Sequence, residues 1–173
     1  TFNEIVKNNP KKDTGSTAYS YIFKQQQIAL KEAFENFKKA ENADLKSLKK
    51  EFDIYKRENN SWLDKDALYE ALSIENGNDY WPLWKSKTDK SLFNPKSIEE
   101  KMEFAKRIHE IETKYADEIE FYAFCQFVVN KQCEATKEYA LSKGIKMIAD
   151  RQVAFSDRDC WAYQSLFLDG WFL

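Results

Sequence analysis

Hydrophobic residues recur every three to four positions over most of the chain, which is the spacing of an amphipathic helix. This pattern predicts one helix over 19–37 and a second over 44–55. Ser61 has the character of an N-cap for a third helix, which should end just before Gly77. The segment 77–95 then breaks the period with aromatic and turn residues, so the first half of the sequence predicts helices joined by loops.

A longer helical pattern occupies residues 98–142 and has clear signals at both ends. Ser97 and Glu100, in "SIEE", form a capping box that predicts the start of a helix, and Gly144 is typical of a helix end. Because ordinary helices are far shorter than this pattern, we expect a break or bend between Thr113 and Asp117.

The pattern changes at "IKMIA", residues 145–149, a short apolar run typical of one buried strand. A helix, a glycine and an apolar strand form the second half of a βαβ unit, which belongs in a parallel sheet. The sequence contains no second convincing strand. The backbone groups of this one therefore need a partner from outside the sequence.

Composition and charge narrow the class of protein. The 173 residues are 43% hydrophobic and 16% aromatic, enough for a core, while the net charge of −2 argues against nucleic acid as a partner. Three cysteines without metal-binding spacing indicate small, buried thiols in a reducing compartment. No apolar run approaches the roughly 20 residues of a membrane span, and no signal-peptide pattern is present, so we expect a cytoplasmic protein without a membrane partner.

Residues with catalytic potential are few. The single histidine, His109, lies in a charged helix without a serine or cysteine at motif spacing, which favours a solvated residue. Asp157 and Asp159 have three interpretations: paired carboxylates for glycoside chemistry, a metal-binding pair, or a turn balanced by Arg158. Their spacing alone fixes neither a separation nor a ligand set, so we favour the turn and expect no metal and no cofactor.

An ordered series of motifs resembles the amylomaltase family, the 4-α-glucanotransferases. Upstream, "KEAFENF", "WLDKDALYEAL" and "YWPLW" are similar to its aromatic helical motifs. Downstream, the resemblance rests on Glu118-Ile119-x-Phe121, Phe124-x-Gln126, Gln132, Lys137-Glu138-Tyr139-Ala140, Gly144-Ile145, Ile148-Ala149-Asp150 and Asp159-Cys160-Trp161-Ala162. The chain departs from the family at Ala149 and Gln152, and its 156–161 segment, "SDRDCW", replaces D-S-A-D-V-W.

The resemblance implies a (β/α)8 barrel with a helical insertion and a retaining mechanism, in which an Asp attacks the sugar and a Glu protonates the leaving group. The family's nucleophile motif, R-I-D-H, does not occur here. We therefore expect a mostly α internal fragment, inactive alone and without catalytic residues. It should comprise a lead-in loop (1–16), the helical insertion with a barrel-flanking helix (17–143), and one barrel strand with its loop (144–173).

Three substrate-binding candidates follow from the resemblance, with α-1,4-glucans (maltodextrins) as the expected partner. Asp150 would lie at the C-terminal end of the barrel strand, where barrel enzymes keep their chemistry, or else simply cap the following loop. Asp159 would lie in an acidic loop lining the sugar cleft. The ring of Trp161, like those of Tyr80–Trp84, suits stacking on a sugar, although such aromatics are more often core residues.

Two other interpretations remain open at this stage. The helical bulk and the apolar end "LFLDGWFL" are also compatible with a self-contained protein-interaction module, and the chain is expected to self-associate through its terminal strand if that strand is unpaired. A different retaining glycosidase of the same superfamily is a third interpretation that the motif residues allow.

Overall fold

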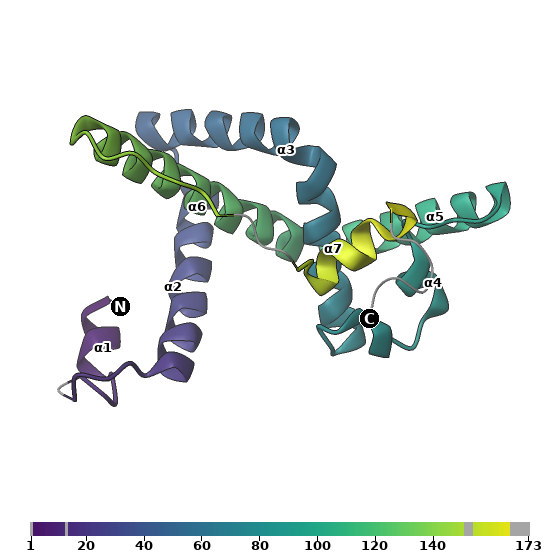
Figure 1. Cartoon of the computed structure of the whole chain (residues 1–173), viewed down its shortest axis with the longest axis horizontal. Coiled ribbons are helices and arrows are strands. Elements are labelled where there is room, and N and C mark those ends of the chain that lie inside the picture. The colour runs from purple at the N-terminus through teal and green to yellow at the C-terminus, as the bar shows by residue number, and fades with distance from the viewer. Residues whose placement is uncertain (1, 13, 151–153, 167–173) are drawn as a thin grey trace. The chain divides into compact units, whose positions relative to one another are not determined.

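The computed structural model describes residues 2–12, 14–150 and 154–166, and this part of the chain is mostly α (Figure 1). No β-strand is formed within these ranges. The helices are α1 (Phe2–Lys7), α2 (Tyr19–Lys39), α3 (Ala43–Asn76), α4 (Lys87–Ser91), α5 (Ile98–Lys114), α6 (Ala116–Ser142) and α7 (Asp157–Ala162), with short 3-10 helices at Trp81–Leu83 and Gln164–Leu166.

The chain divides into two compact units, Thr1–Ile54 and Tyr55–Leu173. The first unit holds α1, α2 and the beginning of α3. Its aromatic core includes an edge-to-face pair between Phe37 and Phe52, whose ring centroids lie 5.7 Å apart. The Lys49 ammonium donates hydrogen bonds of 2.8 Å to the carbonyl oxygens of Lys38 and Ala40, so it caps the C-terminal end of α2.

The second unit is built around the C-terminal part of α3, against which α4, α5 and α7 gather (Figure 1). Apolar side chains from α3, α5 and α7 meet there with Trp84 and Leu92, which flank α4, because the three helices each turn hydrophobic residues to one face. The buried members of this core are Leu68, Tyr69, Ala71, Leu72, Trp84, Leu92, Phe104, Ile111, Trp161 and Ala162. The α6 helix packs nearer the start of the unit, where Tyr55 and Phe127 place their rings 5.6 Å apart.

The helix ends follow the sequence signals closely. Tyr115 separates α5 from α6, which confirms the break expected between Thr113 and Asp117. Gly144 has φ +72° and ends α6 as expected: its N–H donates to Leu141 O, and the next N–H donates to Ala140 O. Gly77, with φ +61°, ends α3 in the same way. Glycine suits both helix ends because any other residue is strained at positive φ.

The prediction of two helices over 44–55 and after Ser61 is wrong, since α3 runs without interruption through both. Ser61 is an interior residue of this helix. No proline or glycine interrupts 56–62, and the polar side chains there bond within the helix: Asn59 donates to Tyr55 O at 2.8 Å and accepts from Trp62 Nε1 at 3.1 Å. An N-cap residue is a weak signal when no breaker accompanies it.

Two further expectations need correction. The lead-in 1–16, expected to be a loop, contains α1, whose Phe2, Ile5 and Val6 have helical spacing. The strand expected over 145–149 is not formed: these residues have no regular secondary structure, and Ile148 is 95% exposed. A strand requires a neighbour to receive its hydrogen bonds, and none is available in the described ranges. The division at 16 and 143 stays a prediction.

Candidate functional site

Asp150, the first predicted substrate-binding residue, lies in the exposed segment that follows Gly144. This segment is apolar but unburied: Ile145 is 58% exposed and Met147 is 59% exposed. Such exposure is unusual for a segment so rich in aliphatic side chains. Gln152, one of the departures from the resembling motif, falls outside the described residues.

Asp159, the second candidate, lies in the first turn of α7. Its backbone N–H donates to Ser156 Oγ at 3.1 Å, and its carboxylate accepts from Ser156 N at 3.3 Å. The two residues therefore form a reciprocal capping box at the start of α7. The expected acidic turn around Asp157 is thus a short helix, and the Asp159 carboxylate is engaged in starting it.

Trp161, the third candidate, is fully buried, with 0% of its surface exposed. Its ring packs edge-to-face against Phe93, Tyr69 and Trp84, at centroid separations of 5.0, 5.4 and 5.8 Å. Its Nε1 donates to Asp89 O at 2.8 Å, so the polar atom of the indole is satisfied. In this arrangement Trp161 is the centre of the core, and no ring face is open to a sugar.

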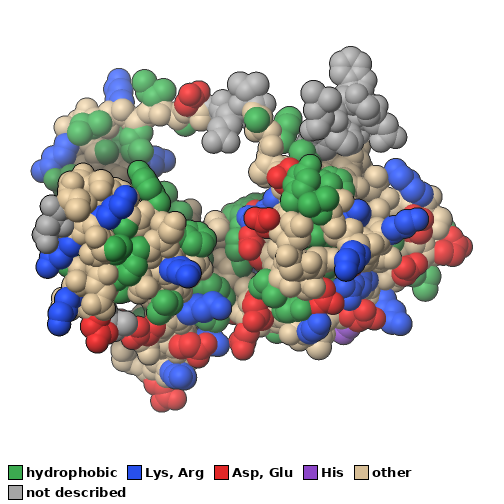
Figure 2. Space-filling model, turned by 90° about the horizontal axis from the view of Figure 1, so that it is seen from below, with side chains coloured by type: hydrophobic (Ala, Val, Ile, Leu, Met, Phe, Trp, Pro, Cys, Tyr) green, Lys and Arg blue, Asp and Glu red, His purple; other side chains and the backbone are tan. Residues whose placement is uncertain are grey.

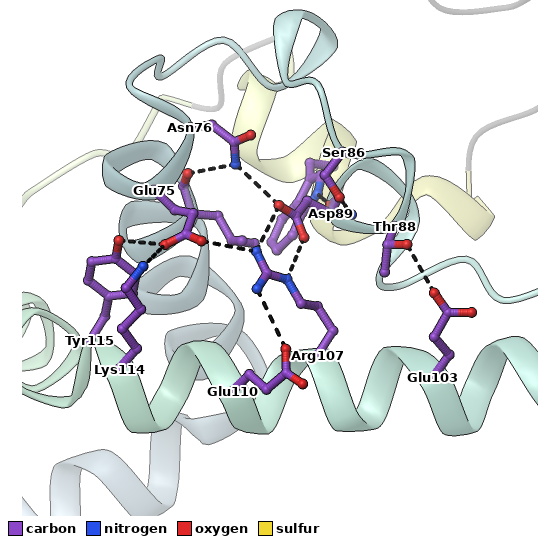
Figure 3. Close-up of polar contacts among 12 residues, drawn as sticks. Glu75, Asn76, Ser86, Thr88, Asp89, Glu103, Arg107, Glu110, Lys114 and Tyr115 are labelled. Atoms are coloured by element: carbon purple, nitrogen blue, oxygen red, sulfur yellow. Dashed lines mark hydrogen bonds and ion pairs between the residues drawn. The ribbon is translucent and has the colours of Figure 1, made fainter.

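A polar cluster joins α3, α4 and α5 beside this core (Figure 3). Asp89 on α4 is only 1% exposed, and its carboxylate accepts two hydrogen bonds from Arg107 on α5, at 2.8 Å from Nε and 3.1 Å from Nη2. This two-pronged contact is the strong geometry for a buried pair. Asn76 Nδ2 donates to the same carboxylate at 3.3 Å. These contacts fix the three helices relative to one another.

Glu75 extends this cluster towards the start of α6. Its carboxylate accepts hydrogen bonds from Lys114 Nζ at 2.6 Å and from the Tyr115 hydroxyl at 2.5 Å, and it lies 3.5 Å from Arg107 Nη2 (Figure 3). The hydrogen bonds from Lys114 and Tyr115 lower the pKa of Glu75 from 4.5 to about 2. A carboxyl held in its charged form in this way is a poor general acid.

A second polar cluster, which we call the Arg158 cluster, joins α7 to α3 and α6. It consists of Asp66, Tyr69, Glu70, Tyr122 and Arg158. Arg158 donates to the Tyr122 hydroxyl at 2.6 Å and to the Glu70 carboxylate, and it lies 3.6 Å from Asp66. Its guanidinium also lies over the rings of Tyr69 and Tyr122, at 5.4 and 5.2 Å. Burial raises the pKa of Asp66 and of Tyr122.

The charge partners of Arg158 differ from those expected from the sequence. It was expected to neutralise Asp157 and Asp159 in a loop, but its contacts are carboxylates and phenols on other helices. The available sequence signal was the spacing of Asp66 and Glu70, which places both carboxylates on one helix face. No sequence signal indicates which cation reaches them from so far along the chain.

The described residues offer little for sugar chemistry by themselves. Retaining hydrolases need two carboxyl groups facing a sugar across about 5 Å, whereas the carboxylates of both clusters are bound to cations and phenols. A hollow of about 240 Å³ beside α4 and α5 has a polar lining that includes Thr88, Asn94 and Glu103. Within the described ranges, no group of three or more His, Cys, Asp or Glu residues is placed to hold a metal ion.

The remaining surface features are ordinary. His109 is exposed on α5, as expected. Figure 2 shows basic and acidic side chains interspersed on the face it displays. Of the three free thiols, Cys133 is exposed, while Cys125 and Cys160 are partly buried, so the expectation of buried thiols holds only in part. No helix in the described part of the chain combines the length and apolar character that a bilayer crossing requires.

Comparison with known proteins shows where the sequence belongs. The family model described as 4-alpha-glucanotransferase matches residues 3–170. A 4-alpha-glucanotransferase of Aquifex aeolicus (strain VF5) is 28% identical over 159 residues, which cover 90% of this chain and 28% of the relative. One of Thermus thermophilus is 28% identical over 155 residues, which cover 88% of this chain and 28% of the relative. No solved structure matched.

The chain therefore spans little more than a quarter of the length of these relatives, since the matched region covers 28% of each. The match nevertheless extends over both units, from α1 to the residues after α7. A family model that covers nearly the whole chain establishes membership. This chain belongs to the 4-alpha-glucanotransferase family.

Proposed function

We propose that this chain is a segment of a longer 4-alpha-glucanotransferase, which moves α-1,4-glucan segments between maltodextrins by a retaining mechanism. The observation that carries the proposal is the family match over residues 3–170. The share of each relative that is matched, 28%, supports a longer parent protein. The family match does not favour a self-contained interaction module. A cytoplasmic location and maltodextrins as substrates stay predictions.

We also propose that 145–149 becomes one strand of a (β/α)8 barrel in the longer protein. The support is physical: Ile145, Met147 and Ile148 are aliphatic yet exposed, and Gly144 redirects the chain at the end of α6. Neighbouring strands would satisfy the backbone groups of this segment, and the barrel interior and outer helices would bury its side chains. Asp150 would then lie at the C-terminal end of the strand, where barrel enzymes bind substrate.

Of the three predicted substrate contacts, Asp150 is the one that the geometry leaves available. The Asp159 carboxylate forms the capping box of α7 with Ser156, and the Trp161 ring is buried in the core. These contacts support roles in the fold for both residues. Their predicted sugar contacts stay predictions. The reacting carboxylates, nucleophile and acid, are proposed to lie in the rest of the parent protein, and the isolated chain is proposed to be inactive.

The experiment compares the activity of this chain with that of the proposed longer protein, expressed from the gene with its flanking coding sequence on both sides. Each is incubated with maltotriose, and the products are separated by chromatography. We expect the longer protein to release glucose together with longer maltodextrins, and the isolated chain to leave maltotriose unchanged. Turnover by the isolated chain would overturn the placement of the catalytic acids, and an inactive longer protein would overturn the proposed activity.

A finer test uses Asp150→Asn in the longer protein, with Asp44→Asn as the matched control on the exposed beginning of α3. If Asp150 contacts the glucan, its substitution should raise KM or lower kcat, while the control variant should behave as the wild type. Equal kinetics for both variants would remove Asp150 from the substrate-binding site.

A further inference from the structure

Hydrogen bonds within the second unit hold the chain on both sides of the exposed segment that contains Asp150. We call these two sets of contacts the two grips. At the first end, Gly144 and the next residue close the last turn of α6 with two 3.0 Å hydrogen bonds. At the second end, Ser156 caps α7, and Arg158 in the first turn of α7 reaches the Tyr122 hydroxyl on α6 at 2.6 Å. Both grips therefore act on the same helix, α6.

The two grips lie far apart along α6. Tyr122 and Ser142 are about 20 residues apart in this helix, which at 1.5 Å per residue is roughly 30 Å. The connection from 143 to 156 has about 14 residues and reaches roughly 46–50 Å when fully extended. The same connection would span only about 21 Å as a helix. A wholly helical connection would therefore be too short to return from Ser142 to the level of Tyr122, and the described residues 145–150 form no helix.

Direction follows from the same two points. The α6 helix advances towards Ser142, and the chain returns from there to Arg158, which contacts Tyr122, so the described residues directly after α6 run back along the helix. Figure 1 shows the described residues after α6 lying back along that helix. This is the arrangement of helix and strand in a βαβ unit, although 145–149 has no strand neighbour here.

We propose that Arg158 is a positioning residue, which anchors the first turn of α7 to Tyr122 and thereby holds residues 145–150 extended and antiparallel to α6. The anchor is well built for this task. The guanidinium is bonded to carboxylates on α3 and a phenol on α6, and it is stacked on the rings of Tyr69 and Tyr122. Trp161 holds the far end of α7 in the core, but Arg158 holds the end that the segment enters.

A consequence for catalysis rests on the proposed function above. With the segment pre-extended, Asp150 has a defined position relative to the helices before any neighbouring strand is added. Arg158 would act through this placement, without touching the substrate.

The structural half of the proposal is tested on the isolated chain by pulsed electron-spin resonance. Nitroxides are attached at Ser142→Cys and Ala154→Cys after the three native cysteines are replaced. We expect one narrow distance population near roughly 30 Å. Arg158→Met should broaden it towards shorter distances, while Arg57→Met, the same change at an exposed site on α3, should leave it unchanged. An unchanged distribution in Arg158→Met would overturn the proposal.

The functional half is tested on the longer protein with maltotriose. We expect Arg158→Met to lower kcat/KM by about 10- to 100-fold, since small misplacements of a site are that costly. Arg158→Lys should restore part of the loss, because it keeps the charge but lacks the planar fork. Wild-type kcat/KM in Arg158→Met would overturn the positioning role.

These outcomes separate the two proposals. If the wild-type longer protein does not disproportionate maltotriose, the proposed function fails, and the distance measurement still decides whether Arg158 holds the segment. If Arg158→Met loses the helical circular-dichroism signal, the distance in Arg158→Lys decides the question. A narrow, wild-type distribution in Arg158→Lys supports the charged anchor, and a distribution without the extended population counts against it.

Discussion

Replacing Glu75 by glutamine tests whether the polar cluster on α3 stabilises the second unit through charge. The folded carboxyl has a pKa of about 2 in place of 4.5, because Lys114 and Tyr115 donate hydrogen bonds to it. A glutamine side chain keeps the size of glutamate but loses the charge. We expect the variant to be less stable than the wild type at neutral pH.

The pKa shift sets the magnitude of this effect. One pKa unit is equivalent to about 1.4 kcal/mol, so the complete shift of Glu75 corresponds to roughly 3.4 kcal/mol as an upper bound. The Glu75 side chain is 24% exposed and that of Lys114 is 60% exposed, so water screens much of the attraction. We therefore expect Glu75→Gln to cost about 1–2 kcal/mol in the free energy of unfolding.

The direction of the pH dependence follows from linkage. Because the folded pKa is lower than the unfolded pKa, the carboxylate stabilises the fold at all pH values above about 4.5. The contribution is lost as the pH falls from there towards about 2, where the folded carboxyl takes up its proton. The difference in stability between wild type and variant should shrink over the same interval.

The assay is urea unfolding at several pH values between about 7 and 3, with tryptophan fluorescence as the signal that monitors unfolding. Every tryptophan of the sequence lies at or after Trp62, so the signal reports the second unit. Glu58→Gln, at an exposed position on α3, is the matched control and should have little effect. A Glu75→Gln difference that stays constant with pH, or is absent at neutral pH, would refute the reasoning.

Three further expectations concern the core, the buried ion pair and the thiols. Trp161→Ala should cost about 3–5 kcal/mol by the same assay, because the residue is fully buried, and a loss below about 1 kcal/mol would contradict its central place in the core. Asp89→Asn should cost about 3–5 kcal/mol by removing the buried charge to which Arg107 donates two hydrogen bonds; equal urea midpoints would contradict this. In the folded chain, iodoacetamide should modify exposed Cys133 first, as read by peptide mass spectrometry, since burial raises the pKa of Cys125; modification of Cys125 first would refute the assignment.

Local signals were the part of the fold that the sequence predicted well. The positive φ angles of Gly77 and Gly144 and the break before α6 are properties of a few adjacent residues, and local chemistry decides them. Ser97 also accepts from Glu100 N as expected, although the Glu100 carboxylate accepts from Lys96 N instead of closing the box on Ser97. The reciprocal bond was therefore displaced by one residue.

Predictions failed where a distant contact decides the outcome. Nothing near Ser61 shows that α3 continues, because its continuation depends on packing along the whole helix. The helical state of 157–162 depends on Trp161 entering a core made by residues about 50 to 90 positions earlier in the chain. The Arg158 cluster likewise joins residues of three helices, so periodicity along one helix gives no sign of it.

The three substrate-binding candidates separate on the same physical ground. The motifs assign Asp150, Asp159 and Trp161 to one substrate-binding segment. Only a side chain that is not already engaged in structural contacts is available to a ligand. Asp159 is engaged by Ser156, and Trp161 is engaged by three aromatic rings and Asp89 O. Asp150 is exposed beyond the end of an apolar segment that follows α6. Substitutions at Asp159 or Trp161 should therefore lower the urea midpoint, whereas a substitution at Asp150 should change the kinetics of the longer protein without changing the urea midpoint.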